Sequence, residues 1–362
     1  MDAHAIAQCR LVNQQIALTR CRKAVEVVSV LGAMQAQDYL GALWAIGLRL
    51  PAATETEVAQ AIAERKIVRT WPMRGTLHFV AAADVRWMLK LLTPRIIAGS
   101  TSRSQRLELD ATVYARCRKV FVRALQGDRQ HTREAMMELL ELEGISTAGQ
   151  RGYHILWRLA QEGLLCFAAR SGKEATFALL DEWVPKARSL DRDASLAELA
   201  HRYFIGHGPA TLRDFVWWSG LKMSDARVAV ENAGSRLARQ TIDGTVYWMP
   251  EGLAEMSNTR RAAYLLPGFD EYLLGYKDRS AVLEPRHAPK VVPGSNGVFQ
   301  PTIVIDGRVV GTWKRVLKKE AVVVTASPFA PLKRAEKILL ADAAERYGRF
   351  LGMPAEMTVG YE

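Results

Sequence analysis

The middle of the chain changes from a helical to a strand-like spacing of hydrophobic residues. Apolar residues recur at the spacing of one helix face over 135–140 and again over 153–160, and a glycine follows each stretch. Two short apolar runs, 164–168 and 175–180, flank the polar sequence 170–174 and predict a β-hairpin. Helix, turn, helix and hairpin is the element order of a winged helix-turn-helix, which we assign to this stretch.

The same order of elements recurs on both sides of this stretch, and repeated units of this length bear on the whole fold. The C-terminal copy is predicted to contain helices over 195–204, 212–217 and 224–230, and strands over 236–242 and 245–249. Asp243-Gly244 between those strands is a strong hairpin signal. The N-terminal copy is predicted to contain helices over 23–36, 39–46 and 57–65, and strands over 69–73 and 76–80.

Residues 262–362 follow a different pattern. Strands are predicted over 297–305, 308–315 and 320–325, and an amphipathic helix over 332–350 would cover one face of their sheet. The predicted fold class is therefore α+β and rich in helix, with three tandem winged helix-turn-helix units and a C-terminal sheet and helix. The predicted domains are a first winged unit at 1–83, a helical linker at 84–130, a second winged unit at 131–186, a third at 187–261, and the C-terminal part at 262–362.

The charge of the chain points to an anionic partner. Lys and Arg number 49 and Asp and Glu number 38, so the formal net charge is +11 (49 − 38) and the isoelectric point is about 9.6. A nucleic acid or another polyanion is the natural partner of such a chain, although a basic protein without such a partner has the same composition.

Composition and cysteine use indicate the compartment. Hydrophobic residues make up 49% of the chain, mean hydropathy is −0.06, and no apolar run approaches the roughly 18 residues of a membrane span. We expect a soluble protein without a signal peptide, located in the cytoplasm and associated with the nucleoid when bound to DNA. Its four cysteines form no Cys-x-x-Cys, which excludes a zinc ribbon and favours free thiols.

Motifs of several common chemistries are missing from the sequence. The chain contains no P-loop, no Gly-x-Gly-x-x-Gly, no His-Glu-x-x-His and no Gly-x-Ser-x-Gly. Nucleotide hydrolysis, dinucleotide-dependent redox chemistry, zinc proteolysis and serine hydrolysis therefore lose their usual support. We expect neither a cofactor nor a metal.

The candidate site is Gln35-Ala36-Gln37, at the polar end of an otherwise apolar stretch. The two primary amides carry donors and acceptors but no charge, so in a cleft they could hold a water without competing for its proton. Residues two apart on an ideal helix do not face the same way, so the alternative is a solvated helix end. Only a break or turn near 35–39 would direct both side chains into one channel.

The predicted second helix of the middle unit carries residues that could face DNA. They are Gln150, Arg151, His154 and Arg158, with Lys173 on the wing. Arginine and lysine there would neutralise phosphates. The alternative is a winged unit used only for packing or protein contact, with these residues on a solvated face.

Several separated motifs, in order, resemble those of the AlkZ-type DNA glycosylases, and the resemblance spans about residues 8 to 350. The stretches that carry it are 34–49, which begins Met-Gln-Ala-Gln-Asp; 69–78, Arg-Thr-Trp-Pro-Met-Arg-Gly-Thr-Leu-His; 265–274, Leu-Leu-Pro-Gly-Phe-Asp-Glu-Tyr-Leu-Leu; and 304–315, Val-Ile-Asp-Gly-Arg-Val-Val-Gly-Thr-Trp-Lys-Arg.

The resemblance implies tandem winged helices in a C-shaped arrangement with a basic DNA-binding channel. It implies a monofunctional glycosylase, monomeric on double-stranded DNA, that acts on N7-alkylated purines, including purines in interstrand crosslinks. The family signature is Gln-aliphatic-Gln in one branch and Gln-aliphatic-Asp in the other. Gln35 and Gln37 match the first branch as catalytic residues, and Ala36 is the smallest aliphatic choice.

The expected chemistry suits a pair of neutral amides. Alkylation at N7 makes the purine cationic, so the base departs neutral and a general acid is scarcely needed. Two amides can orient the attacking water beside the oxocarbenium-like sugar, whereas carboxylates would do so more strongly through charge. Asp38, Asp270 and Glu271 are the rival carboxylates, for which capping or pairing with arginine is the structural alternative.

Candidate DNA contacts come from basic residues along the chain, each with a solvated or structural role as its alternative. They are Arg69, Arg74, His78, Arg151, Lys277, Arg279, Arg308, Lys314 and Arg315. A non-enzymatic winged-helix DNA-binding protein, either a regulator or a protein that binds lesions without excising them, is the competing function. Regulators usually bind paired half-sites as dimers, whereas three winged units in one chain favour a monomer around DNA.

Overall fold

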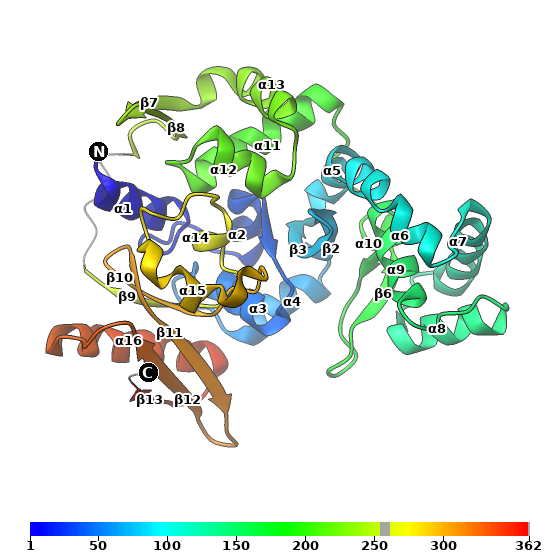
Figure 1. Ribbon diagram of the computed structural model, residues 1–362. Helices are drawn as coiled ribbons and strands as arrows, with labels where there is room; N and C mark the ends of the chain where they lie inside the picture. The colour runs from blue at the N-terminus through cyan, green and yellow to red at the C-terminus, as the bar shows by residue number, and fades with distance from the viewer. Residues whose placement is uncertain (254–260, 361–362) are drawn as a thin grey trace. The chain divides into compact units, whose positions relative to one another are not determined.

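The computed structural model describes residues 1–253 and 261–360, which form two compact units (Figure 1). The first unit contains 1–59 and 196–362, and the second contains 60–195. Helices α4 (Glu55–Ala63) and α11 (Arg192–His207) each run through a boundary between the units. The division into five segments expected from the sequence places its boundaries elsewhere and stays a prediction.

The second unit combines antiparallel strands with helices. Its strands pair in the order β3-β2-β5-β6-β4, and each of these pairs is antiparallel. The elements are β2 (Ile67–Met73), β3 (Thr76–Ala81), η1 (Ala82–Asp84), α5 (Val85–Gly99), α6 (Thr101–Arg106), α7 (Ala111–Leu125), β4 (His131–Thr132), α8 (Arg133–Leu142), α9 (Arg151–Gln161), β5 (Leu165–Phe167), β6 (Thr176–Leu179) and α10 (Leu180–Trp183). The two hairpins predicted here are confirmed as β2–β3 and β5–β6.

Helix α7 belongs to the core of the second unit. The sequence placed this stretch in a linker, but Cys117 and Phe121 of α7 share one hydrophobic cluster with Met136 of α8 and with Ile155 of α9. The helix shows apolar residues on one face and charged residues on the other, as burial of a single face requires. The same cluster also includes Trp71 of β2 and Leu77 of β3, so α7 packs into a core that strands β2 and β3 share.

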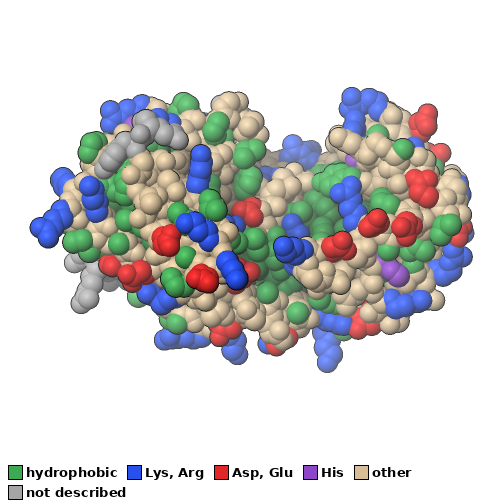
Figure 2. All heavy atoms as spheres, turned by 90° about the horizontal axis from the view of Figure 1, so that it is seen from below, with side chains coloured by type: hydrophobic (Ala, Val, Ile, Leu, Met, Phe, Trp, Pro, Cys, Tyr) green, Lys and Arg blue, Asp and Glu red, His purple; other side chains and the backbone are tan. Residues whose placement is uncertain are grey.

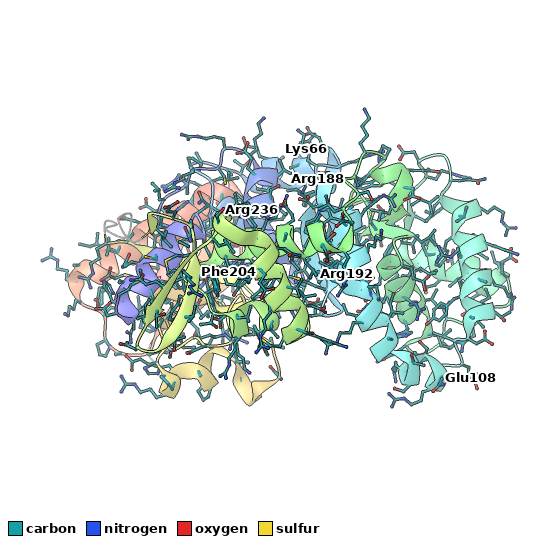
Figure 3. The ribbon with its side chains drawn as sticks, turned by 90° about the horizontal axis from the view of Figure 1, so that it is seen from above. Lys66, Glu108, Arg188, Arg192, Phe204 and Arg236 are labelled. Atoms are coloured by element: carbon teal, nitrogen blue, oxygen red, sulfur yellow. The ribbon has the colours of Figure 1, made fainter. Side chains whose placement is uncertain are left out.

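The helices of the first unit come from both ends of the chain. They are α1 (Ala3–Asn13), α2 (Ala24–Leu31) and α3 (Tyr39–Gly47), then α11, α12 (Leu212–Ser219) and α13 (Met223–Ala233), followed by η2 (Gly234–Arg236). Short strand β1 (Ala33–Gln35) lies between α2 and α3. Phe204 of α11 is fully buried, where its ring packs against Tyr203 and Phe215 (Figure 3).

Hairpin β7 (Ala238–Ile242) and β8 (Thr245–Met249) follows α13, as predicted. Asp243 and Gly244 in its turn have φ of 46° and 75°, the left-handed values that a two-residue hairpin turn requires. An isolated bridge joins Ala210, just before α12, to Trp248 of β8. The third copy of the repeated element order is therefore present.

The C-terminal part of the first unit is a sheet covered by a helix. Its strands are β9 (Ala263–Leu266), β10 (Thr302–Ile305), β11 (Arg308–Leu317), β12 (Val322–Pro328) and β13 (Ala355–Val359), in the order β13-β12-β11-β10-β9. Only β12 and β13 pair in parallel. The connection from β9 to β10 holds α14 (Glu271–Leu274), η4 (Pro285–His287), α15 (Ala288–Val291) and η5 (Pro293–Ser295). Strand β10 is shorter than predicted because it begins at Thr302.

Helix α16 (Arg334–Leu351) packs on this sheet and joins it to α3. The ring of Tyr347 contacts Trp44 of α3 and Trp313 of β11, with centroid separations of 5.0 and 5.2 Å. Trp44 Nε1 donates to Leu265 O at 2.7 Å and Trp313 Nε1 donates to Leu266 O at 2.8 Å. Both indoles are thus buried with their one donor satisfied; Trp44 holds α3 against β9, and Trp313 links β11 to β9.

All four cysteines are buried free thiols. Burial raises the pKa of Cys117 to about 11, and burial likewise raises the pKa values of Cys21 and Cys166. No helix within residues 1–253 and 261–360 is long and apolar enough to cross a bilayer.

Candidate active site

The Gln35-Ala36-Gln37 segment is not helical. Helix α2 ends at Leu31, and strand β1 begins at Ala33 and ends at Gln35, so the helix predicted over 23–36 is too long. Ala36 follows the strand, and Gln37 and Asp38 form a bend before α3. Met34 and Ala36 are buried, Gln35 is half-buried and Gln37 is exposed. The break in the chain that a shared channel for the two amides would require is therefore present.

Asp38 stands between this segment and α3. Its backbone occupies the N-cap position of the helix, but its side chain makes no capping hydrogen bond. The carboxylate instead lies 3.9 Å from the guanidinium of Arg315 on β11, and Arg315 also donates to the Tyr347 hydroxyl at 2.8 Å. Asp38 is exposed and pairs loosely with an arginine, which fits a surface ion pair better than a capping role.

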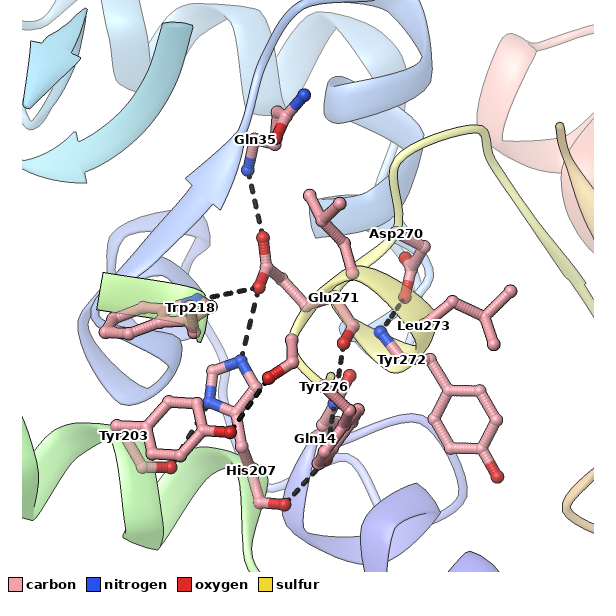
Figure 4. A network of polar contacts seen from close by, with 12 residues as sticks. Gln14, Gln35, Tyr203, His207, Trp218, Asp270, Glu271, Tyr272, Leu273 and Tyr276 are labelled. Carbon is pink, nitrogen blue, oxygen red and sulfur yellow. Dashed lines mark hydrogen bonds and ion pairs between the residues drawn. The ribbon is translucent and has the colours of Figure 1, made fainter. Parts of the chain in front are cut away.

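Glu271 lies directly behind Gln35 (Figure 4). Its carboxylate is buried and accepts three hydrogen bonds: Oε1 from the main-chain N–H of Gln35 at 3.1 Å, and Oε2 from Trp218 Nε1 at 2.9 Å and from His207 Nε2 at 3.3 Å. The acceptors and donors match, so the carboxylate is satisfied although it is out of water. Glu271 therefore touches the backbone of the candidate site.

Asp270 has a different partner from its neighbour. Its two oxygens accept from the guanidinium of Arg49 at 2.8 and 2.9 Å, and the exposed fractions of these two side chains are 2% and 0%. Asp270 Oδ1 also accepts from the N–H of Tyr272, which caps α14. A bidentate buried pair of this kind fixes the start of α14. The structural alternative considered for Asp270 is the one observed.

The turn before α14 is close-packed. A Cβ atom at Gly268 would lie 2.7 Å from the Phe299 carbonyl oxygen, so only glycine fits there. Phe269 has φ of +61°, a value that residues with a side chain rarely adopt. The neighbouring contacts of Asp270 and Glu271 hold this conformation in place.

The polar network extends from Glu271 into the helices. Gln14 of α1 donates to the Tyr276 hydroxyl at 3.0 Å and to the Glu271 carbonyl at 3.2 Å, and its own oxygens accept from Arg49. Tyr276 donates in turn to the His207 carbonyl at 2.6 Å. Burial raises the pKa of Tyr276, so its hydroxyl remains a neutral donor.

The arrangement combines neutral amides at the surface with a fully satisfied carboxylate behind them. Such a site can orient a water through hydrogen bonds, while the carboxylate acts on the backbone and not on the reacting atoms. Within the described part of the chain, no three His, Cys, Asp or Glu side chains are grouped closely enough to hold a metal ion.

The candidate DNA contacts on hairpin β2–β3 are mostly buried. His78 has no exposed surface, and its ring nitrogens lie 2.9 Å from the Thr76 carbonyl and 3.2 Å from the Arg74 guanidinium. Arg69 is 9% exposed, with its guanidinium over the ring of Phe167. His78 and Arg69 therefore expose little or no surface, and DNA contacts by them stay predictions.

The middle helix α9 is also tied to its surroundings. Arg151 donates to the carbonyl oxygens of Ser146 and Leu107, so its guanidinium joins the loops before α9 and before α7. His154 is buried, bonded to Ser104 and stacked on Trp157. The DNA contact of Arg151 stays a prediction.

The remaining basic candidates lie on the first unit. Lys277 and Lys314 are exposed, and Arg308 lies 3.6 Å from Glu284. Arg279 lies between the rings of Trp217 and Phe299 and donates to the Leu273 carbonyl. On the face shown in Figure 2, Lys and Arg side chains are interspersed with Asp and Glu. DNA contacts by these residues stay predictions.

Several residues of the network were not found from the sequence. They include Gln14, Arg49, His207, Trp218 and Tyr276. Arg49 lies inside a stretch that carries the family resemblance, which is the one signal that could have drawn attention to it. Gln14 and His207 have no local pattern that sets them apart.

Comparisons with known proteins agree with this geometry. The family model described as DNA glycosylase AlkZ-like matches residues 28–350. A curated relative, the interstrand DNA cross-link repair glycosylase of Streptomyces sahachiroi, is 29% identical over 347 residues, which cover 87% of this chain and 88% of the relative. The solved structure of Streptomyces sahachiroi DNA glycosylase AlkZ is 25% identical and superposes with a TM-score of 0.81, covering 99% of this chain and 100% of that one.

Proposed function

The chain belongs to the AlkZ-like DNA glycosylases, and from that premise we propose that it hydrolyses the N-glycosidic bond of N7-alkylated purines in duplex DNA. Gln35 and Gln37 orient the attacking water and support the sugar as it acquires positive charge. The single observation that carries the proposal is the break between α2 and α3 at this segment, where β1 ends at Gln35, Ala36 is buried, Gln35 is half-buried and Gln37 is exposed.

The neutrality of the amide pair sets the substrate class. An N7-alkylated purine already carries a positive charge and leaves as a neutral base, so the bond needs a positioned water more than a charged catalyst. Amides supply position at modest electrostatic strength, whereas an uncharged base would need stronger stabilisation of the transition state. We therefore expect slow or no release of unmodified purines.

Duplex DNA is held by the repeated units. The order helix, strand or bridge, two helices and hairpin occurs at 24–81, 111–179 and 192–249, which supports three winged helix-turn-helix units. The exposed Lys277 and Lys314 are candidate phosphate contacts on the first unit.

Interstrand crosslinks are a further substrate that we propose. The relative from Streptomyces sahachiroi is named for their repair, and it covers most of this chain. A crosslinked base stays attached to the other strand and cannot be fully extruded into a closed pocket. A site at the surface, where Gln37 is exposed, is compatible with such a base.

The test is release of base from a duplex with one N7-methylguanine at a defined position. The protein should generate an abasic site that alkali converts into a strand break, and a matched duplex with guanine should remain intact. Binding of the lesion without any base release would contradict the proposal and support a protein that only recognises damage. Sequence-specific binding of undamaged DNA would support a regulator.

A further inference from the structure

Glu271 is the buried carboxylate closest to the proposed catalytic segment along the hydrogen-bond network. Its side chain is 1% exposed, and its three donors come from three separate elements: β1, α11 and α12 (Figure 4). A buried carboxylate is costly unless such donors surround it. An apolar residue in its place would leave the N–H groups of Gln35 and Trp218 without this acceptor.

We propose that Glu271 is a positioning residue that fixes the direction of the two glutamine side chains through the main-chain N–H of Gln35. The inference rests on the proposed function of Gln35 and Gln37. The N–H of a residue is bonded to the same Cα as its side chain, so a hydrogen bond at the amide restricts rotation of the backbone that aims the side chain. Gln37 follows two residues later, at the bend between β1 and α3.

The position of the carboxylate is itself fixed from two sides. The Arg49–Asp270 pair holds the start of α14, where Glu271 is the first residue. Trp218 of α12 holds the other side, because its indole N–H donates to the carboxylate at 2.9 Å. The Arg49–Asp270 pair and Trp218 thus place one carboxylate oxygen against one amide of β1.

His207 completes the polar surroundings of Glu271. Its Nδ1 lies 3.2 Å from the Tyr203 carbonyl and its Nε2 lies 3.3 Å from Glu271, so both nitrogens face oxygen acceptors. Glu271 Oε2 thus faces His207 and Trp218, while Oε1 faces the main-chain N–H of Gln35, as expected of a group that acts through the backbone.

The experiment compares Glu271→Ala and Glu271→Gln with the unaltered protein. We measure the single-turnover rate of N7-methylguanine release, and the dissociation constant on a duplex whose 2′-fluoro lesion resists hydrolysis. We expect Glu271→Ala to lower the rate about 100-fold, because a displacement of about 1 Å is enough for such a loss, while affinity for DNA changes less than about twofold. Glu271→Gln should be intermediate, because its amide can accept from Gln35 or from Trp218 but not from both.

A spectroscopic measurement reports the contact without using activity. In protein labelled with ¹⁵N-glutamine, the backbone amide proton of Gln35 should resonate downfield because it is bonded to a carboxylate. It should move upfield in Glu271→Ala. Circular dichroism and thermal melting check that each variant is folded, and Glu271→Gln answers the question if Glu271→Ala does not fold.

The two tryptophans of α12 supply a matched pair of variants. Trp218→Phe removes the donor to Glu271, whereas Trp217→Phe removes a donor to a carbonyl of the same helix α14. We expect Trp218→Phe to slow base release and to shift the Gln35 amide resonance, and Trp217→Phe to do neither.

The outcomes separate this inference from the proposed function. If the unaltered protein releases N7-methylguanine and folded Glu271→Ala does so within about threefold of its rate, the positioning role is overturned while the function stands. An unmoved Gln35 amide resonance overturns the contact itself, whatever the activity. If the unaltered protein releases no base, the proposed function fails, and the resonance still decides whether Glu271 holds the segment.

Discussion

Two segments with the same order of elements use the residues between strand and helix in different ways. In the second unit, β4 runs directly into α8, and Thr132, its last residue, caps the helix by accepting from Ala135 N at 3.2 Å. In the first unit, residues 36–38 intervene between β1 and α3, and Asp38 at the cap position makes no side-chain capping bond. Thr211 before α12 behaves like Thr132 and forms a capping box with Asp214.

The difference shows where a site can arise in a repeated fold. A threonine that caps the next helix uses its polar group on local backbone. The segment that contains Gln35 and Gln37 is instead held from behind by Glu271, 236 residues away from Gln35 in the chain. Because a distant element holds this segment, its polar side chains are not needed for capping and can take part in a reaction. Variants at matching places in the two segments test this difference.

The largest effect is expected when the buried Arg49–Asp270 ion pair, which fixes the start of α14 behind the first segment, is broken. Arg49→Met leaves the Asp270 carboxylate buried without its partner, which should lower the free energy of unfolding by about 3–5 kcal/mol. Chemical denaturation followed by circular dichroism measures it. Arg349→Met, which removes an exposed pair with Glu345, is the control and should cost about 1 kcal/mol or less. Equal losses of unfolding free energy in the two variants would show that the buried pair stabilises the fold no more than the exposed pair does.

The next effect concerns the amides themselves. Gln35→Ala and Gln37→Ala should each lower the single-turnover rate of N7-methylguanine release by about 100-fold or more, because each removes a group that positions the water. Binding to the resistant duplex should not change. Thr132→Ala, at the matching place in the second segment, should release base at the normal rate. Full activity in both glutamine variants would remove the catalytic assignment.

A smaller effect distinguishes the two helix starts. Thr132→Ala should reduce the free energy of unfolding by about 1 kcal/mol, because it deletes the capping bond to Ala135. Asp38→Ala should change the free energy of unfolding by no more than a few tenths of the loss expected for Thr132→Ala, because no capping hydrogen bond is lost. Both are measured by urea denaturation. A comparable loss in the two variants would mean that Asp38 caps α3 in solution.

The smallest effect is a pH dependence in the second segment. Burial, together with Arg103 and Arg158, lowers the pKa of His154 below its usual value near 6.5. The unfolded chain then binds the proton more readily, so stability should fall as pH drops through about 6.5 and level off below the folded pKa. His154→Gln should reduce the difference between unfolding free energies measured at pH 7.5 and 5.5. Identical pH dependence in the two proteins would contradict this.

Local turn chemistry explains what the sequence predicted well. The Asp-Gly pairs at 243–244 and 306–307 predict hairpins because their left-handed φ values suit a two-residue turn, and both hairpins are present. The helix predicted over 23–36 failed at its end, because the apolar residues of 24–34 fit either a helix or a buried strand. The sequence did not predict strand β13. This strand pairs in parallel with β12, which lies well before it in the chain, so no hairpin turn marks the pairing in the sequence.

The candidate site, like the fold, was predicted from the sequence only in its local features. The Gln-Ala-Gln pattern is local and was found, whereas its surroundings depend on contacts between distant parts of the chain. His207 and Trp218 meet Glu271 from 64 and 53 residues away, and neither stands in a pattern that announces a polar partner. The surroundings of the basic residues depend on folding too, because Arg151 and His78 contact carbonyl oxygens and a neighbouring guanidinium, and their DNA contacts stay predictions.

The four buried cysteines bear on how the protein withstands electrophiles. Reagents that alkylate DNA also attack thiolates, which are stronger nucleophiles than DNA bases. Cys9, Cys21, Cys117 and Cys166 are all shielded from water, and raised pKa values at the last three keep those thiols protonated. The enzyme thus presents no ready thiol target to an electrophile, and it can stay intact in a cell whose DNA is being alkylated.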